Sequence, residues 1–495
     1  FLSGTIPNVF ASYTNLTRLG FAGNCHTGTL PHYIANLTQL NFLDVSNNFL
    51  NGTIPSSYGN LWMMNFMWLS NNSFTGTLPT TLCNLTHMKY LYVNSNKLHG
   101  TIPTNINTMT DMSFLDLGGN SFTGTVPTGL SALSKLVFFG CYENQLVSTI
   151  PNFLTTLSEL RYLYMYSNAF TGTIPHNLGD LRHMLFLFMQ KNKLHGPIPS
   201  NIGNMHRLLQ CYLYDNTISG TLPVSIGNMS HLQYLYLQSN RLSGTVPIEL
   251  SHLSSLVSIL LEDNMFIGDL NNAFNPTIQQ NLTTITLSDN QFTGTLPDAV
   301  FLLPQLSTFV GVNNCFTGRL KEIMCNSTKI IALALDGMQS AKTCRVTLLP
   351  HISTSYLSDN SIRSTIPLCL FTLPRLNTLH LSGNGLTGSL PEHMSISNNL
   401  FDLSLSHNVL TGSIPLVIQQ RTWYNLDLSY NRFTGALLPP LETQPINFTY
   451  SIRLNPTQSK NYTKDASTLA LGLENNRLSG EIPDSVLNIH NISIL

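Results

Sequence analysis

Charged residues are scarce in this sequence. They make up 9% of its 495 residues, and the formal net charge is −1, whereas soluble domains usually carry about 25% charged residues. No basic field is present that could displace the counterions of a nucleic acid, so nucleic acid is excluded as an expected partner. A surface so poor in charge needs another source of solubility, either attached glycans or burial against other molecules.

Sequence motifs of enzymes and membrane spans are also lacking. The chain contains no Gly-x-Ser-x-Gly, no phosphate-binding glycine loop and no His-Glu-x-x-His. Its 15 histidines are scattered, and no local spacing sets two carboxylates as a close pair. No apolar run is long enough for a transmembrane helix, and no signal peptide is seen. We therefore expect no enzyme, no metal and no cofactor.

A unit of 24 residues organises most of the chain. The stretch Asn168-Ala-Phe-Thr-Gly-Thr-Ile-Pro175 recurs with its glycine position at intervals of 24 residues from Gly4 to Gly268, with Ser148 standing in once. A fixed period of this size, with L-x-x-L-x-L-x-x-N-x-L, is the signature of a leucine-rich repeat solenoid. The sequence predicts an α/β solenoid, a curved right-handed superhelix of about 20 repeats. Its concave side would be a parallel sheet and its convex side irregular or 3-10 helical.

Two interruptions divide this regular pattern. The degenerate unit has Met338 where the Asn belongs and Lys342 where the Gly belongs. A second break, between Gly435 and Gly480, contains a polar insertion with prolines. We therefore predict a regular solenoid at 1–320, degenerate cysteine-containing repeats at 321–364, a solenoid at 365–437, an insertion at 438–468 and a further repeat at 469–495.

The consensus L-x-G-x-I-P after each Asn resembles the plant-type class of extracellular leucine-rich repeats, over essentially the whole chain. The insertion resembles the island that precedes the last repeats of plant receptor-like proteins and some receptor kinases. In that family the island helps to form the ligand site, and a few repeats and a membrane helix follow. Phe1 and Leu495 both lie inside repeats, so we expect the chain to be part of a longer one.

An aromatic column occupies the positions that should point outward from the concave sheet. Neighbouring strands lie about 4.8 Å apart, so these rings would follow an arc of roughly 40 Å. A contiguous apolar strip of this length usually marks a contact surface. The alternative is that the rings only stack on one another and stiffen the sheet. The predicted binding residues are Phe42, Phe66, Trp68, Tyr90, Tyr92, Phe114, Phe138, Tyr162, Tyr164, Phe186, Phe188, Tyr212 and Tyr236.

Acidic residues accompany this column on the predicted concave side. They favour a cationic partner only weakly, and we interpret them as solvated surface charge, interrupted by Lys191. They are Asp44, Asp116, Glu143, Asp215, Glu262 and Asp263.

Threonines form a second regular row, directly after the repeat glycine. One interpretation is a Thr-x-Thr array that orders water and binds ice. The other is that β-branched residues favour the small second sheet of this repeat class, which we prefer. The row comprises Thr5, Thr29, Thr53, Thr77, Thr101, Thr125, Thr149, Thr173, Thr221 and Thr245.

Sequons predict a secreted glycoprotein whose only non-protein groups are N-linked glycans. Four of them recur eight residues after the glycine position, which should lie on the convex side. These four are Asn36, Asn84, Asn228 and Asn326, and the others are Asn15, Asn51, Asn71, Asn281, Asn447, Asn461 and Asn491.

Four of the eight cysteines cluster around the degenerate unit, at Cys315, Cys325, Cys344 and Cys369. A secreted setting favours disulfides, and three connectivities exist for four cysteines. We favour Cys325–Cys344, which would staple the degenerate repeat. Two further cysteines, Cys141 and Cys211, occupy core leucine positions and are predicted to be buried free thiols.

The sequence thus predicts a secreted, glycosylated interaction or structural protein of the cell surface, wall or extracellular matrix. It would bind a partner, either a second copy or another extracellular protein, through its aromatic concave face, and could assemble into a fibre or layer. The alternative is the ectodomain of a receptor-like protein that recognises a peptide or a glycan. Ice binding is a distant third hypothesis.

Overall fold

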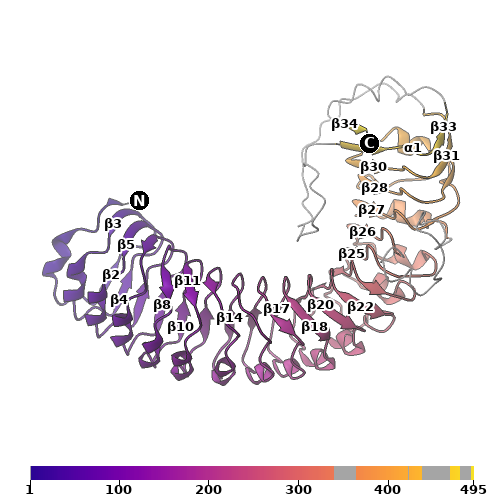
Figure 1. Ribbon diagram of the computed structural model, residues 1–495. Coiled ribbons are helices and arrows are strands. Elements are labelled where there is room, and N and C mark those ends of the chain that lie inside the picture. Colours follow the sequence, from indigo (N-terminus) through magenta and orange to yellow (C-terminus); the bar gives the residue numbers. More distant parts are fainter. Residues whose placement is uncertain (1, 339–363, 422, 438–468, 480–491, 495) are drawn as a thin grey trace. The chain divides into compact units, whose positions relative to one another are not determined.

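A computed structural model gives the structure of the chain and describes residues 2–338, 364–421, 423–437, 469–479 and 492–494. By their internal contacts the residues form two units, 1–260 and 261–495. Each unit is described separately below. Figure 1 shows that short strands line one side of each unit and that a second layer of turns and short helices lies behind them.

The main sheet of the first unit contains one three-residue strand from each turn, all parallel. Consecutive strands pair in register at the 24-residue interval, for example Phe114 with Phe138. These strands are β2 (Arg18–Gly20), β4 (Phe42–Asp44), β6 (Phe66–Trp68), β8 (Tyr90–Tyr92), β10 (Phe114–Asp116), β12 (Phe138–Gly140), β14 (Tyr162–Tyr164), β15 (Phe186–Phe188), β17 (Gln210–Tyr212), β19 (Tyr234–Tyr236) and β21 (Ser258–Leu260).

The central residue of each strand points into the core, because successive side chains of a strand alternate between the two faces. Leu43, Leu115 and Leu163 are fully buried there. The first and third residues of each strand point outward, onto the concave face. The fold therefore fixes the central position as apolar and leaves the outward positions free to vary.

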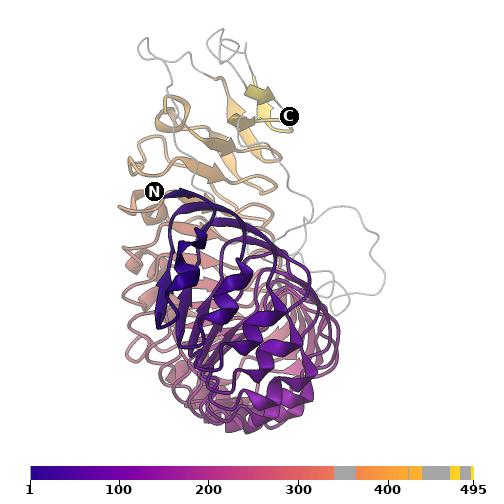
Figure 2. The same ribbon diagram turned by 90° about the vertical axis from the view of Figure 1, so that its left-hand side faces the viewer.

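Short 3-10 helices form the opposite, convex side, and most of them directly follow a proline in extended conformation at the N-cap position. Figure 2 presents this side of the first turns. In the first unit they are η1 (Asn8–Ser12), η2 (His32–Asn36), η3 (Ser56–Asn60), η4 (Thr80–Asn84), η5 (Thr104–Thr108), η6 (Thr128–Ala132), η7 (Asn152–Thr156), η8 (Leu178–Asp180), η9 (Ile202–Asn204), η10 (Val224–Asn228) and η11 (Ile248–His252).

An asparagine ladder joins consecutive turns. The amide of Asn168 donates to the carbonyls of Cys141 at 2.9 Å and Tyr166 at 3.2 Å, and its Oδ1 accepts from the N–H of Leu146 at 3.0 Å. Each such side chain thereby bonds backbone groups of its own turn and of the preceding one, and it accepts from a main-chain N–H, such as that of Leu146, that would otherwise be buried without a partner. The same pattern holds at Asn48, Asn72, Asn96, Asn120, Asn144, Asn192, Asn216 and, in the second unit, Asn290, Asn314, Asn408 and Asn431.

Small second sheets lie beside the main sheet, between the Asn and the convex helix of each turn. In the first unit their strands are β1 (Ser3–Gly4), β3 (Cys25–Thr29), β5 (Phe49–Thr53), β7 (Ser73–Thr75), β9 (His99–Thr101), β11 (Ser121–Gly124), β13 (Gln145–Leu146), β16 (His195–Gly196), β18 (Thr217–Thr221) and β20 (Arg241–Gly244). Members of the threonine row, such as Thr29, Thr53 and Thr101, end these strands. Their position agrees with the second-sheet interpretation of the row.

The packing explains why glycine precedes each of these threonines. Gly172 has a φ of +78°, and a Cβ placed on it would lie 2.7 Å from Cγ2 of Thr149, one turn earlier. The threonine methyl thus occupies the space of the missing side chain. Thr and Gly therefore recur together because each turn packs on the next.

The main sheet of the second unit runs through both predicted interruptions. Strand β26 pairs directly with β27, with Ala332 opposite Thr378, and β30 pairs directly with β32. The intervening 339–363 and 438–468 lie outside the described residues. The strands are β23 (Thr284–Thr286), β25 (Thr308–Val310), β26 (Ala332–Ala334), β27 (Thr378–His380), β28 (Asp402–Ser404), β30 (Asn425–Asp427), β32 (Leu469–Gly472) and β34 (Ile492–Ile494).

The remaining elements of the second unit repeat the layers of the first. Its second-sheet strands are β22 (Met265–Gly268), β24 (Gln291–Phe292), β29 (Thr411–Ser413), β31 (Arg432–Gly435) and β33 (Arg477–Leu478), and its convex helices are η12 (Asp298–Leu302), η13 (Glu322–Asn326), η15 (Leu368–Thr372) and α1 (Leu416–Gln419). The internal contacts divide the chain after Leu260. They do not test the predicted domain boundaries at 320, 364, 437 and 468, which stay predictions.

The predicted Cys325–Cys344 disulfide is wrong, because Cys325 is bonded to Cys369, with 5.9 Å between their Cα atoms. Cys325 lies in η13 and Cys369 in η15, and β26 and β27 of the same two turns are neighbours. The two cysteines therefore occupy adjacent turns although 44 residues separate them. Cys344 lies outside the described residues. Cys141 and Cys211 are buried free thiols, as predicted.

Replacing Asn168 by Ala tests the ladder. The substitution leaves the N–H of Leu146 without a partner and removes one of the donors to the carbonyls of Cys141 and Tyr166, which should cost about 2 kcal/mol locally. We expect hydrogen-exchange protection of residues 141–168 to fall by about thirtyfold. Asn60→Ala, at an exposed convex position, is the matched control. Equal protection in the two variants would show that the ladder adds nothing to stability.

Candidate ligand-binding face

The structure places all thirteen predicted aromatic residues at outward positions of the main sheet in the first unit. They form two columns, one from the first residue of each strand and one from the third. All of them are half-buried, and none is among the strongly exposed apolar residues. We call these thirteen residues, together with Tyr142, Tyr166, Tyr214 and Tyr234, the aromatic band.

The first column is a continuous ladder of rings from β4 to β15. The rings of Phe66 and Tyr90 stack with 4.7 Å between centroids and 10° between planes, and Tyr90 stacks on Phe114 at 4.9 Å. Phe138, Tyr162 and Phe186 extend the ladder at 5.4 to 6.2 Å. Offset stacking of this kind contributes about 0.5–1.5 kcal/mol per pair beyond burial.

The ladder then continues in the second column. Tyr164, Phe188, Tyr212 and Tyr236 stack in turn at 4.7, 4.5 and 4.6 Å, with planes within 16° of one another. An edge-to-face contact of Phe138 with Tyr164 at 5.1 Å connects the two columns. Stacking, which we had considered as the alternative to ligand binding, is thus present, but it leaves the rings only half-buried.

A third outward column was missed by the sequence reasoning. It comprises the residue two positions after each strand, where Tyr142 stacks on Tyr166 at 4.8 Å and Tyr214 lies beside Tyr212. The signal was available, because each of these tyrosines follows a core residue such as Cys141 and so continues the alternation beyond the strand. Two buried glutamines, Gln190 and Gln238, share this column, and their Oε1 atoms have no hydrogen-bond partner.

The interpretation of the acidic residues as solvated charge is wrong for Asp44 and Asp116, which are 9% and 6% exposed. Both end strands of the main sheet, Asp44 in register with Trp68 and Asp116 with Tyr92. Asp44 Oδ1 accepts from the N–H of Ser46 at 3.0 Å and from its hydroxyl at 2.7 Å. Glu143 and Asp263 are exposed, and Lys191 is exposed as well. Burial also raises the pKa of Glu262, although a hydrogen bond from Thr286 opposes the shift.

Burial keeps several tyrosines of the band protonated at neutral pH. It raises the pKa of Tyr92 and of Tyr166 to about 12, and nearby carboxylates add to both shifts. The pKa values of Tyr142 and Tyr212 are raised further, mainly by burial, to which Asp116 adds at Tyr142 and the neighbouring Tyr236 at Tyr212. The band therefore presents ring faces and neutral hydroxyl donors.

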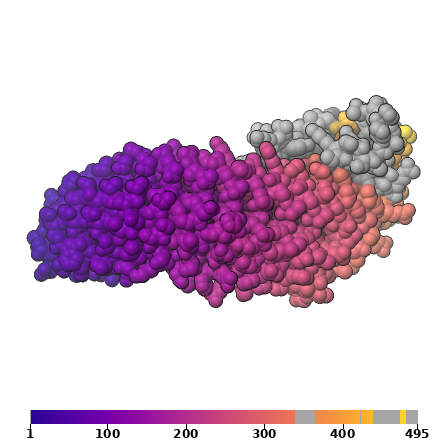
Figure 3. All heavy atoms as spheres, turned by 60° about the horizontal axis from the view of Figure 1, so that its bottom comes forward, coloured from indigo at the N-terminus to yellow at the C-terminus, as the bar shows by residue number. Residues whose placement is uncertain are grey.

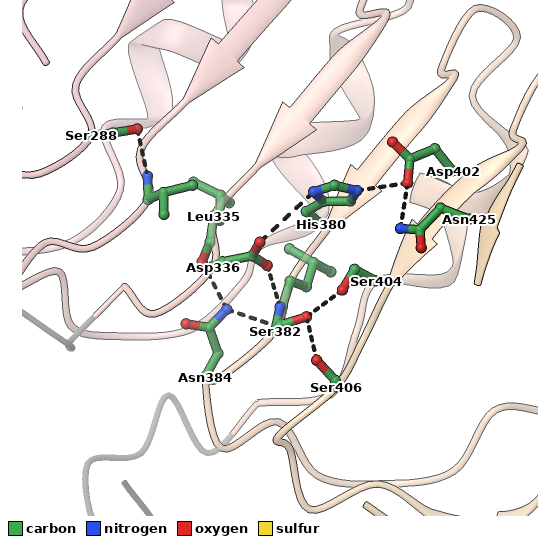
Figure 4. A network of polar contacts seen from close by, with 12 residues as sticks. Ser288, Leu335, Asp336, His380, Ser382, Asn384, Asp402, Ser404, Ser406 and Asn425 are labelled. Atoms are coloured by element: carbon green, nitrogen blue, oxygen red, sulfur yellow. Dashed lines mark hydrogen bonds and ion pairs between the residues drawn. The ribbon is translucent and has the colours of Figure 1, made fainter. Parts of the chain in front are cut away.

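The outward positions of the second unit carry a polar cluster instead of rings (Figure 4). His380 Nε2 lies 2.7 Å from Asp402 Oδ1, and His380 Nδ1 lies 3.8 Å from Asp336 Oδ2. Asp336 Oδ1 accepts from the N–H of Ser382 at 2.5 Å, and Ser382 Oγ lies 2.7 Å from Ser404 Oγ. Sequence reasoning missed this cluster because Asp336 becomes a neighbour of Ser382, 46 residues later, only when β26 pairs with β27.

Comparison with known proteins agrees with these structural observations. A leucine rich repeat family model matches residues 207–266, and a single-repeat model matches 39–61, 64–85, 159–181, 281–303 and 375–397. The chain is a leucine-rich repeat solenoid. No curated protein matches its sequence significantly.

Solved structures of plant leucine-rich repeat ectodomains share this solenoid. The ectodomain of the receptor kinase GASSHO1/SCHENGEN3 from Arabidopsis thaliana, in complex with CASPARIAN STRIP INTEGRITY FACTOR 2, is 29% identical with a TM-score of 0.72. That match covers 100% of this chain and 60% of the other. The Arabidopsis receptor kinase HAESA, in complex with the peptide hormone IDA and the co-receptor SERK1, is 27% identical with a TM-score of 0.69, over 99% of this chain and 84% of the other.

A third structure supports the fold alone, since it is only 24% identical. The plant peptide hormone receptor RGFR1, in complex with RGF2, matches with a TM-score of 0.80 over 100% of this chain and 76% of the other.

In the described part of this solenoid, no helix has the length and apolar character to cross a membrane. Within the same residues, no three His, Cys, Asp or Glu side chains are grouped to hold a metal ion.

The pH dependence of stability tests the His380 cluster. Burial alone would lower the pKa of His380, but the hydrogen bond to Asp402 and the negative charges of Asp402, Asp336 and Asp427 outweigh it and raise the pKa. The stabilisation from the charged imidazole is therefore fully present below its ordinary pKa of about 6.5 and is lost as the pH rises through the raised value.

We expect His380→Gln to lower the melting temperature of the solenoid more at about pH 6 than at about pH 9. The matched control is His407→Gln, at an exposed position of the next turn. A loss of melting temperature in His380→Gln that stays constant or grows as the pH rises would contradict the positive charge assigned to His380.

Proposed function

We propose that this solenoid is an extracellular ligand-binding module that holds an extended peptide against its aromatic band. The observation that carries the proposal is the band itself, a set of half-buried rings stacked along consecutive strands. Stacking fixes each ring before any ligand arrives, so binding should cost little side-chain entropy. Aromatic residues, which combine apolar faces with hydroxyl donors, supply much of the binding energy in many interfaces.

The dimensions of the band suit a short peptide. The eight strands from β6 to β19 span about 34 Å at about 4.8 Å per strand, and an extended chain covers about 3.3 Å per residue. A segment of about ten residues would therefore reach from one end to the other. Peptide carbonyls could accept from the tyrosine hydroxyls of the band.

Two of the similar structures support a peptide rather than a second copy of the chain. HAESA is complexed with a peptide hormone, and GASSHO1/SCHENGEN3 with CASPARIAN STRIP INTEGRITY FACTOR 2. Our main sequence-based hypothesis, a structural glycoprotein that assembles into a fibre or layer, receives no such support and stays a prediction. Ice binding by the threonine row also stays a prediction.

A random decapeptide library on beads, screened with the full-length glycosylated protein, tests the proposed function. We expect peptides to be retained and their binding to weaken at least fivefold in Tyr164→Ala and Tyr236→Ala, because truncation of a central interface ring costs more than about 1 kcal/mol. Phe49→Ala is the control, since Phe49 is 63% exposed on the second sheet. A library that yields no binder would refute the proposal.

Light scattering of the same sample separates the two hypotheses about partners. A single monomeric species at every concentration is expected if the band is reserved for a peptide. Ordered assemblies that the two tyrosine substitutions dissolve would instead support the fibre or layer.

Glycosylation of the convex side should leave the band accessible. All eight sequons among the described residues are exposed, and Asn36, Asn84, Asn228 and Asn326 end the convex helices η2, η4, η10 and η13. Figure 3 shows the surface on which these helices lie. Asn447, Asn461 and Asn491 fall outside the described residues. We propose N-linked glycans at the four convex sites, on a secreted protein.

Enzymatic deglycosylation followed by mass analysis of peptides tests this pattern. We expect an Asn-to-Asp conversion at each of the four convex sites and unchanged peptide binding after glycan removal, because the two faces are opposite. Unmodified asparagines at these positions would contradict both the glycans and the secreted location.

A further inference from the structure

A single charge lies within the aromatic band. The eight strands from β6 to β19 present 24 outward residues in the three columns, all of them described by the structure. Asp116 is the one among them that carries a charge. It ends β10, in register with Tyr92 on one neighbouring strand and with Gly140 on the other. The carboxylate is thus placed in the middle of a surface that otherwise consists of rings and neutral polar groups.

The carboxylate of Asp116 is poorly satisfied within the chain. Its Oδ1 accepts from the N–H of Gly118 at 3.0 Å, whereas its Oδ2 lies 3.5 Å from the hydroxyl of Tyr142, at the limit of a hydrogen bond. Asp116 takes part in none of the ion pairs found in the described parts of the chain. A buried charge without a cation is costly unless a partner compensates it.

Comparison with two equivalent turns shows what Asp116 lacks. Asp44 and Asp427 end β4 and β30, and each is followed two residues later by a serine. That serine donates its N–H at 3.0 or 3.1 Å and its hydroxyl at 2.7 Å to the carboxylate. In the turn of Asp116 this position is Gly118. The aspartate is retained there, but its internal hydroxyl donor is absent.

Glycines allow this carboxylate and the ring of Tyr142 to pack closely against the neighbouring turns. A Cβ on Gly140 would lie 2.9 Å from Asp116 Oδ1, and a Cβ on Gly118 would lie 2.3 Å from the ring of Tyr142. Any larger residue at either position would therefore displace the carboxylate or the ring. Rings beside a carboxylate are the arrangement that recognises an alkylammonium or guanidinium ion, through cation–π attraction and a charged hydrogen bond.

We infer that Asp116 binds a cationic nitrogen of the peptide ligand, on a Lys or Arg side chain or at the amino terminus. The rings that line this subsite are those of Tyr92, Phe138 and Tyr142. The inference rests on the proposed function, because the cation arrives as part of a peptide held on the aromatic band. When the cation is bound, it replaces the weak contact with the Tyr142 hydroxyl and compensates the buried charge.

The pH dependence of binding follows from the burial of this group. Burial raises the pKa of Asp116 to about 6, although the Gly118 and Tyr142 contacts oppose the shift. The titratable groups that face it are Tyr92, Tyr142, Tyr164, Tyr166 and Cys141, and burial raises the pKa of each, so all stay neutral. A cation requires the ionised carboxylate, so affinity should fall about tenfold from about pH 7 to about pH 5.

The test compares the wild type, Asp116→Asn and Asp44→Asn on the decapeptide library, in one arm with free amino termini and in a second arm with acetylated ones. We expect the wild type and Asp44→Asn to enrich cationic peptides several-fold over the input. Asp116→Asn should lose this preference. Persistence of the preference in the acetylated arm would assign it to side chains, and its loss there to the amino terminus.

The best wild-type peptide is then measured against analogues in which citrulline replaces Arg, norleucine replaces Lys, or acetylation removes the terminal charge. A tenfold or greater loss with the neutral analogue, and a loss of affinity at low pH, would support the subsite without depending on the variant. Binders that lack a cationic preference, or a preference that survives in Asp116→Asn, would overturn the inference and leave the proposed function intact. A library without binders would overturn both.

Discussion

The satisfaction of backbone polar groups between consecutive turns is the constraint on which this solenoid depends. Each turn is too short to pair its own N–H and C=O groups, so the ladder asparagine, represented by Asn168, joins its own turn to the preceding one. This bridging requires each turn to repeat the register of the last one. The strict period of 24 residues and the recurring Gly and Thr therefore have one common physical origin.

The same constraint explains why a ligand-binding face can arise here. Central strand positions such as Leu115 must fill the core, but the outward positions take no part in joining the turns. In the first unit they are occupied by rings, and in the second by the His380 cluster and by small residues such as Ala332 and Ala334. Two surfaces of different chemistry thus occupy equivalent positions of one repeat, which is how repeat proteins separate fold from function.

The sequence was sufficient to predict the layers and the two aromatic columns, because both follow from a period and an alternation. It was insufficient wherever the spacing changed. The pairing of β26 with β27 brings Cys325 beside Cys369 and Asp336 beside Ser382, yet neither contact can be counted from a regular repeat. The burial of Asp116 was missed for another reason, since it depends on neighbouring rings and glycines that a single position does not reveal.

The buried carboxylate is best understood as a departure from the stabilising pattern of its own fold. The turns of Asp44 and Asp427 show that the repeat can satisfy an aspartate internally by adding one serine. Folding alone would favour that solution at Asp116 as well, because an unsatisfied buried charge destabilises the protein. The missing serine at the centre of the aromatic band is a local departure from the most stable sequence. Sequences retain such departures where a site serves binding at the expense of stability.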